Sequence, residues 1–203
     1  MKRLVVAMVL AGVLTCGCSS TKQGALEPSV TDTAPTTAPV TSTTSTSTPP
    51  TPIGAAIVAA PNGFTPSSDP QAHSGPVDAT RLNALFNSTD VATQSHFVSG
   101  QEAVYDANKS ADSIHIIVLE FATSDEAQQF MQSISIDNTS SQPDPGVPGG
   151  EIFDSTTAQA DGGWKHVAQG VKGTRVYEIS YISDTAAPVP LLGVLSSQQY
   201  GRL

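Results

Sequence analysis

Apolar residues are arranged in three different ways along the chain. Residues 4–14 form one continuous apolar run, residues 19–54 show no hydrophobic periodicity, and apolar positions recur at strand or helix spacing only after that. A regular spacing of apolar side chains indicates an element with one buried face. We therefore expect one folded domain over residues 55–203.

Two β-hairpins are predicted inside this domain. Residues 114–121 carry apolar side chains on both faces, which is typical of a central strand, and residues 101–107 form the expected partner across a polar turn. Residues 164–171 and 174–183 predict a second hairpin around a tight turn. Residues 152–153 predict one further short strand.

Each predicted hairpin is followed by a helical pattern. Thr123-Ser124-Asp125-Glu126 has the spacing of a capping box, which is the expected role of its two carboxylates. Residues 190–200 predict a helix after the second hairpin, and Asp78 is expected to cap a short helix before the first. This order predicts the α+β class, with one antiparallel sheet of about five strands, helices packed mainly on one face, and a disordered tether in front.

The N-terminal apolar run has the features of an export signal. Lys2 and Arg3 precede about eleven apolar or small residues, whereas a membrane-spanning helix needs about twenty. We therefore expect the chain to be exported and to keep no transmembrane helix.

Residues 14–20, Leu-Thr-Cys-Gly-Cys-Ser-Ser, resemble the lipobox of bacterial lipoproteins. The resemblance implies a signal peptide over residues 1–17, a diacylglyceryl group on the Cys18 thiol, and fatty acyl chains such as palmitate. Gly17 before Cys18 fits the pattern; Cys16 is the alternative lipid site. A disulfide between the two cysteines would close almost no loop and so would stabilise almost nothing.

Residues 18–54 are predicted to form a disordered tether. Residues 31–52 contain ten Thr, three Ser and five Pro, so this stretch has too few apolar side chains to offset its chain entropy. Proline keeps such a segment extended. Its composition also resembles O-glycosylated stalks, so a glycosylated tether and a bare linker both remain open.

The charge balance excludes one class of partner. The 203 residues include 9 Lys and Arg and 18 Asp and Glu, for a net charge of −9, which argues against nucleic-acid binding. Removal of Lys2 and Arg3 with the signal peptide leaves 7 Lys and Arg against 18 Asp and Glu, which is a net charge of −11. An anionic domain is repelled by an anionic membrane surface, so the predicted lipid must supply the attachment.

Sequence motifs for catalysis or metal binding are absent. There is no G-x-S-x-G, H-E-x-x-H, P-loop or dinucleotide glycine motif, and residues 55–203 contain no cysteine. None of the four histidines lies three or four residues from another. His115 and His166, both on predicted strands, meet across the sheet in one interpretation and form separate hydrogen bonds in the other. We therefore predict no catalytic residue, metal or cofactor.

Two carboxylates lie in largely apolar strands. Glu120 and Glu178 would have a raised pKa if they were buried without partners. The alternative is that each reaches an edge or pairs with Arg175 or Lys165.

Four aromatic residues are candidates for a binding surface. Trp164, Tyr105, Tyr177 and Tyr181 would line a ligand groove if they shared a sheet face without helices, and would fill the core otherwise.

Several short pieces of the domain are similar to a family of exported actinobacterial proteins of undefined function. They are residues 61–64 (Pro-Asn-Gly-Phe), 97–100 (Phe-Val-Ser-Gly), 120–123 (Glu-Phe-Ala-Thr), 147–150 (Val-Pro-Gly-Gly) and 198–203 (Gln-Gln-Tyr-Gly-Arg-Leu). The similarity implies a single envelope domain and carries over no catalytic residue.

These features together favour a lipid-anchored lipoprotein on the outer face of the cell membrane. Its domain is expected to be a non-enzymatic binding module for a small apolar ligand or an envelope protein partner. Two alternatives remain, an envelope hydrolase with an Asp/His site assembled by the fold, and a purely structural or assembly lipoprotein. The sequence identifies no ligand-binding residue.

Overall fold

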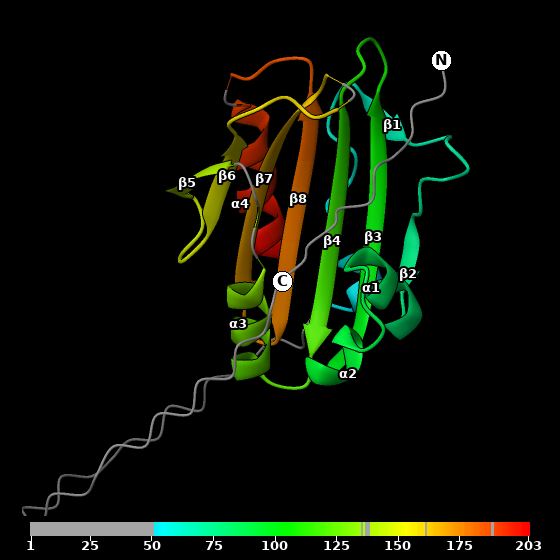
Figure 1. Cartoon of the computed structure of the whole chain (residues 1–203), viewed down its shortest axis with the longest axis vertical. Coiled ribbons are helices and arrows are strands. Elements are labelled where there is room, and N and C mark those ends of the chain that lie inside the picture. Colours follow the sequence, from blue (N-terminus) through cyan, green and yellow to red (C-terminus); the bar gives the residue numbers. More distant parts are fainter. Residues whose placement is uncertain (1–50, 135, 137–138, 161, 188) are drawn as a thin grey trace, which may run out of the picture. The chain divides into compact units, whose positions relative to one another are not determined.

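The computed structural model describes residues 51–203 apart from residues 135, 137–138, 161 and 188 (Figure 1). The predicted signal peptide, both candidate lipid sites and the predicted tether up to residue 50 lie outside the described residues. No helix in the described part of the chain is long and apolar enough to cross a membrane.

Five helical segments and eight strands make up the described chain. In order they are η1 (Ile53–Ala55), β1 (Phe64–Pro66), β2 (Gly75–Val77), α1 (Ala79–Leu85), α2 (Val91–Gln94), β3 (Phe97–Ala107), β4 (Ser113–Phe121), α3 (Ser124–Ser133), β5 (Thr139–Pro143), β6 (Glu151–Ser155), β7 (Trp164–Lys172), β8 (Arg175–Ser183) and α4 (Pro190–Arg202).

All eight strands belong to one antiparallel sheet. Its order is β1-β3-β4-β8-β7-β6-β5, and β2 pairs with β3 next to β1. The two predicted hairpins are β3–β4 and β7–β8, and pairing of β4 with β8 joins them at the centre. The α+β class is thus confirmed, with eight strands in place of about five. The additional β1 and β2 have three residues each, and β5 is an exposed polar strand at one edge, so none has a clear apolar alternation.

The predicted helix starts are confirmed by their caps. The Asp78 side chain accepts a hydrogen bond from the Arg81 amide at 2.8 Å, and the Thr123 hydroxyl accepts one from the Glu126 amide at 3.2 Å. Each cap satisfies a backbone N–H that has no partner in the first helical turn. The turn between β7 and β8 contains Gly173 with a φ of +60°, a conformation that glycine adopts readily.

Helices lie on both faces of the sheet. On one face, here called the α4 face, Ile116 of β4 and Ile179 of β8 pack with Leu192 and Leu195 of α4. On the opposite face, a second core includes Phe121 of β4 together with residues of α1, α2 and α3. Figure 1 shows α4 behind β7 and β8, and α1, α2 and α3 in front of the sheet.

The expectation that helices pack mainly on one face holds for three of the four α-helices, while the longest lies on the other face.

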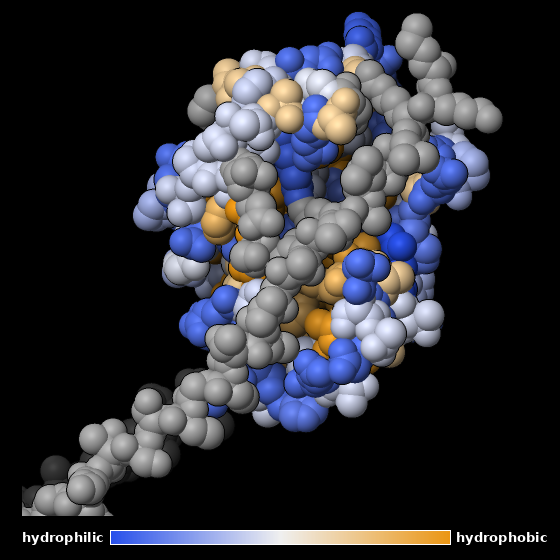
Figure 2. Space-filling view, viewed as in Figure 1, coloured by the Kyte–Doolittle hydropathy of each residue, from blue (hydrophilic) through white to orange (hydrophobic). Residues whose placement is uncertain are grey.

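Hydrophilic residues predominate along the rim of the face that carries α1, α2 and α3 (Figure 2).

The contact between Gly170 and Tyr177 tests the packing of the α4 face. A Cβ on Gly170 would lie 2.7 Å from the Tyr177 ring, which is fully buried and whose hydroxyl bonds Ser196 at 2.6 Å. We expect Gly170→Ala to lower the free energy of unfolding by about 1–3 kcal/mol in urea denaturation, because the ring has no free space to move into.

Gly193 is the matched control, because it lies within α4 and an added Cβ meets no atom within 4 Å. Gly193→Ala is expected to raise the free energy of unfolding by about 0.5–1 kcal/mol through helix propensity. Equal effects of the two substitutions would contradict the described packing.

Candidate ligand-binding groove

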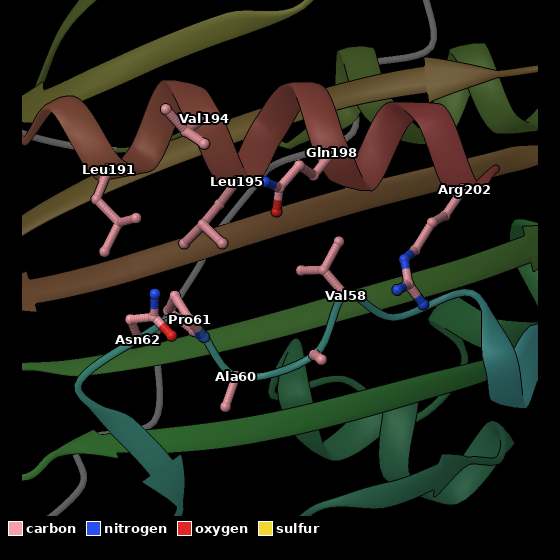
Figure 3. A pocket seen from close by; sticks show the side chains of 10 residues that line it. Val58, Ala60, Pro61, Asn62, Leu191, Val194, Leu195, Gln198 and Arg202 are labelled. Atoms are coloured by element: carbon pink, nitrogen blue, oxygen red, sulfur yellow. The ribbon is translucent and has the colours of Figure 1, made fainter.

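A groove runs beside α4, between this helix and the segment of residues 58–62 that leads into β1 (Figure 3). Its volume is about 590 Å³. Sites for small molecules in proteins usually have volumes of roughly 300–1,000 Å³. The groove is therefore large enough for a small ligand.

Seven of the ten residues that line the groove are apolar. Figure 3 shows Leu191 and Leu195 projecting from α4 toward the facing segment, and Arg202 at the far end of the helix from Leu191. Asn62 and Gln198 supply uncharged polar groups. The apolar lining comprises Val58, Ala59, Ala60, Pro61, Leu191, Val194 and Leu195.

Buried hydrogen bonds hold the two walls together. Gln199, fully buried, donates from Nε2 to the Ala56 carbonyl at 2.7 Å and accepts from the Val58 amide at 3.1 Å. The Tyr105 hydroxyl donates to the Val58 carbonyl at 2.9 Å. A wall fixed in this way loses little conformational entropy when a ligand binds, so the groove is preorganised.

Arg202 places a positive charge at one end of the groove. Its Nη1 donates to the carbonyl oxygens of Ile57 at 3.0 Å and Ala55 at 3.5 Å. Burial raises the pKa of Tyr105, and the Arg202 charge opposes that rise. The positive charge of the Arg202 guanidinium therefore acts on groups around it, such as Tyr105. Its two hydrogen-bond partners are carbonyl oxygens, which carry no formal negative charge.

The predicted aromatic residues do not form this groove. Tyr105, Tyr177 and Tyr181 do share one sheet face, but η1 and α4 cover it and the three rings lie in the core. Burial raises the pKa of Tyr177 to about 12, and burial together with Asp112 raises that of Tyr181 to about 12. The prediction of a groove on an uncovered face is thus wrong, and core packing is confirmed for the three tyrosines. Trp164, at the start of β7, is partly buried and belongs to neither core. The sequence contained no clear indication of the α4 groove, because its two walls come from distant parts of the chain.

The two strand histidines lie on opposite faces of the sheet. His115 pairs in register with Ser180, and Val167 pairs with the same serine, so His166 points the other way. The interpretation in which the histidines meet is therefore wrong. The alternative is confirmed, because His115 bonds Glu102 at 2.9 Å and His166 bonds Asp154 at 2.7 Å.

Asp154, His166 and Ser183 follow one another in space as the acid, base and nucleophile of a hydrolase triad do. His166 Nδ1 lies 2.7 Å from the Asp154 carboxylate, and Nε2 lies 3.4 Å from the Ser183 hydroxyl. However, Nε2 also bonds the Thr185 carbonyl at 3.2 Å, and the Ser183 hydroxyl donates to that carbonyl at 2.7 Å. A general base needs an Nε2 without a hydrogen and a nucleophile that donates to it. The hydrogen bonds of His166 and Ser183 to the Thr185 carbonyl instead attach the segment after β8 to the sheet.

Glu102 is the centre of a charged cluster that the sequence did not predict. This carboxylate is fully buried on β3 and accepts hydrogen bonds from Arg81 Nε at 2.7 Å and His115 Nε2 at 2.9 Å, and it also pairs with His73. Burial would raise the pKa of Glu102, but the bonds from His115 and Arg81 and their charges lower it to about 2. The partners come from separate elements, so no local spacing identifies them.

Of the two carboxylates singled out in the strands, Glu120 forms a predicted ion pair, and Glu178 acts on Lys165 through its charge. Glu120 pairs with Arg175 at 3.3 Å, which confirms pairing over an isolated buried carboxylate. Glu178 accepts from Ser180 at 3.0 Å, and its charge opposes the lowering of the Lys165 pKa by burial. Within the described ranges, no three His, Cys, Asp or Glu residues are grouped so that they could hold a metal ion.

Comparisons with known proteins yield little for this chain. No family model matches it, and no curated protein sequence matches at a significant level. Among solved structures, the extracellular domain of PknH from Mycobacterium tuberculosis is similar, with a TM-score of 0.49 and 13% sequence identity over 73% of this chain and 93% of that domain.

The low pKa of Glu102 predicts how stability depends on acid. A carboxylate with a pKa of about 2 in the folded state and 4.5 in the unfolded state stabilises the fold above pH 4.5, and this contribution is lost as the pH falls through about 2. Glu102→Gln should remove a contribution of the order of 3 kcal/mol at neutral pH. The difference from wild type should shrink as urea denaturation is repeated from about pH 5 down to about pH 2.

Glu151→Gln is the control for this series, since Glu151 is exposed on β6 and should leave the pH dependence unchanged. A constant difference between wild type and Glu102→Gln across the whole range would show that the charge of Glu102 does not stabilise the fold.

Proposed function

We propose that this protein is a non-enzymatic binding module of the cell envelope whose α4 groove holds a small apolar ligand. The single observation that carries the proposal is the preorganised, mainly apolar groove of about 590 Å³. Its walls are held by the buried side chain of Gln199, so no large rearrangement has to precede binding.

Export and lipid anchoring belong to the same proposal and rest on the sequence. The short apolar run after Lys2 and Arg3 and the lipobox-like residues 14–20 support an exported chain held at the outer face of the membrane through Cys18, with Cys16 as the alternative. The Thr- and Pro-rich stretch that follows would serve as a spacer between lipid and domain.

A hydrolase is the second candidate, favoured by the approach of Asp154, His166 and Ser183. Binding is preferred because Ser183 is only 4% exposed and its hydroxyl is engaged with the Thr185 carbonyl. Loss of an esterase activity in Ser183→Ala would favour the hydrolase instead. A purely structural role is the third candidate and predicts an empty groove.

Binding can be measured with the fluorescent apolar probe N-phenyl-1-naphthylamine. Gln198 is exposed on α4, and Figure 3 shows its side chain directed toward the groove. We expect Gln198→Trp to fill the groove and weaken probe binding by about tenfold or more. Val98→Trp is the matched control, because Val98 is 59% exposed, lies on β3 and does not line the groove. Equal binding by both variants, or no binding by wild type, would contradict the proposal.

The lipid site can be assigned by mass spectrometry of the protein extracted from its own membrane. Cys18→Ser should abolish the diacylglyceryl mass, because only a thiol at the processed N-terminus accepts it, while Cys16→Ser should keep it. The reverse result would move the anchor to Cys16, and an acyl-free wild type would end the lipoprotein proposal.

A further inference from the structure

We infer that the ligand of the α4 groove is a single-chain amphiphile with an anionic head group, of the fatty acid class. The head group would lie at Arg202 and the hydrocarbon chain would lie along α4 toward Leu191. This inference rests on the proposed function, namely that the groove binds a small apolar ligand.

The charge of the lining favours an anion. Arg202 is the only charged residue among the ten that line the groove, in a chain that carries 18 acidic residues against 9 Lys and Arg. An acidic protein whose groove is lined by a cation and no carboxylate is complementary to a negatively charged head group.

The hydrogen bonds of Arg202 leave it suited to bind a carboxylate. Within the described part of the chain, only Nη1 makes hydrogen bonds, and both go to main-chain carbonyls. A guanidinium carries five N–H donors arranged as a fork that matches the two oxygens of a carboxylate. The bonds to Ile57 and Ala55 also hold the side chain in place against the groove wall.

The apolar part of the groove fits a chain of medium length. Leu191 and Arg202 lie at opposite ends of the groove in Figure 3. They are eleven residues apart on one helix, which corresponds to roughly 16 Å at about 1.5 Å per residue. An extended saturated chain of medium length spans a comparable distance.

An exposed apolar residue lies on the same wall. Val194 is 53% exposed, one of two large hydrophobic side chains in the described chain with this degree of exposure. A hydrocarbon chain in the groove would cover part of it, which is favourable because apolar surface is removed from water.

The test compares dodecanoate with 1-dodecanol, which share a chain but differ in charge. Each is used to displace N-phenyl-1-naphthylamine from full-length protein in which Cys16 and Cys18 are both serine, so that no attached lipid competes. We expect dodecanoate to bind about tenfold or more tightly than dodecanol. Added salt should weaken the binding of dodecanoate more than that of dodecanol.

Arg202→Gln is expected to bring dodecanoate down to the affinity of dodecanol, and Arg202→Lys to retain a preference for dodecanoate. Lys172→Gln is the matched control, because Lys172 contacts Tyr200 near the same end of α4 and does not line the groove. It should leave the preference for dodecanoate unchanged.

The outcomes separate this inference from the proposed function. Equal affinity of wild type for both compounds would overturn the anionic head group while leaving an apolar binding site. An equal loss of affinity for both compounds in Arg202→Gln would show that Arg202 only holds the groove wall, and would overturn the inference as well. Failure of the probe and of both compounds to bind would overturn the proposed function and this inference with it.

Discussion

The antiparallel pairing of β4 with β8 is the contact on which the rest of the structure depends. It joins two hairpins across a long sequence separation, with Glu120 and Arg175 of the paired strands 55 positions apart. Closing a loop of this length costs chain entropy. The cost is offset because the two strands contribute to both cores, with Ile116 and Ile179 on the α4 face and Val176 on the other. A slip of one residue would exchange the faces and place both cores wrongly.

The groove follows from how α4 is attached to this sheet. Leu192 and Leu195 pack into the core, and Ser196 bonds the buried Tyr177 hydroxyl, so the inner side of the helix is firmly anchored. An anchored helix can present apolar side chains such as Val194 to solvent without losing its position. The segment before β1 is held to α4 by the buried Gln199 amide, in place of pairing with a strand. These two hydrogen bonds set the distance between the groove walls.

Polar side chains, both buried and exposed, attach elements to one another. All four histidines lie beside a carboxylate, and the Glu102 cluster ties α1 and the segment before β2 to the sheet. A histidine beside an aspartate is also the start of a catalytic dyad, so residue types alone do not separate the two uses. For His166 the second ring nitrogen separates the structural use from the catalytic one. It bonds the Thr185 carbonyl rather than a free nucleophile, which favours the structural use.

Local features of this protein were readable from its sequence. The apolar alternation of residues 114–121, the caps Asp78 and Thr123, and the turn at Gly173 depend on neighbours within a few positions, and each was predicted. The short strands β1, β2 and β5, the side of the sheet that α4 covers, the partners of Glu102 and the groove were not. These depend on contacts between segments far apart in the chain. Only the tertiary structure decided them, because a sequence pattern shows that a residue needs a buried face or a partner but does not say which distant residue supplies it.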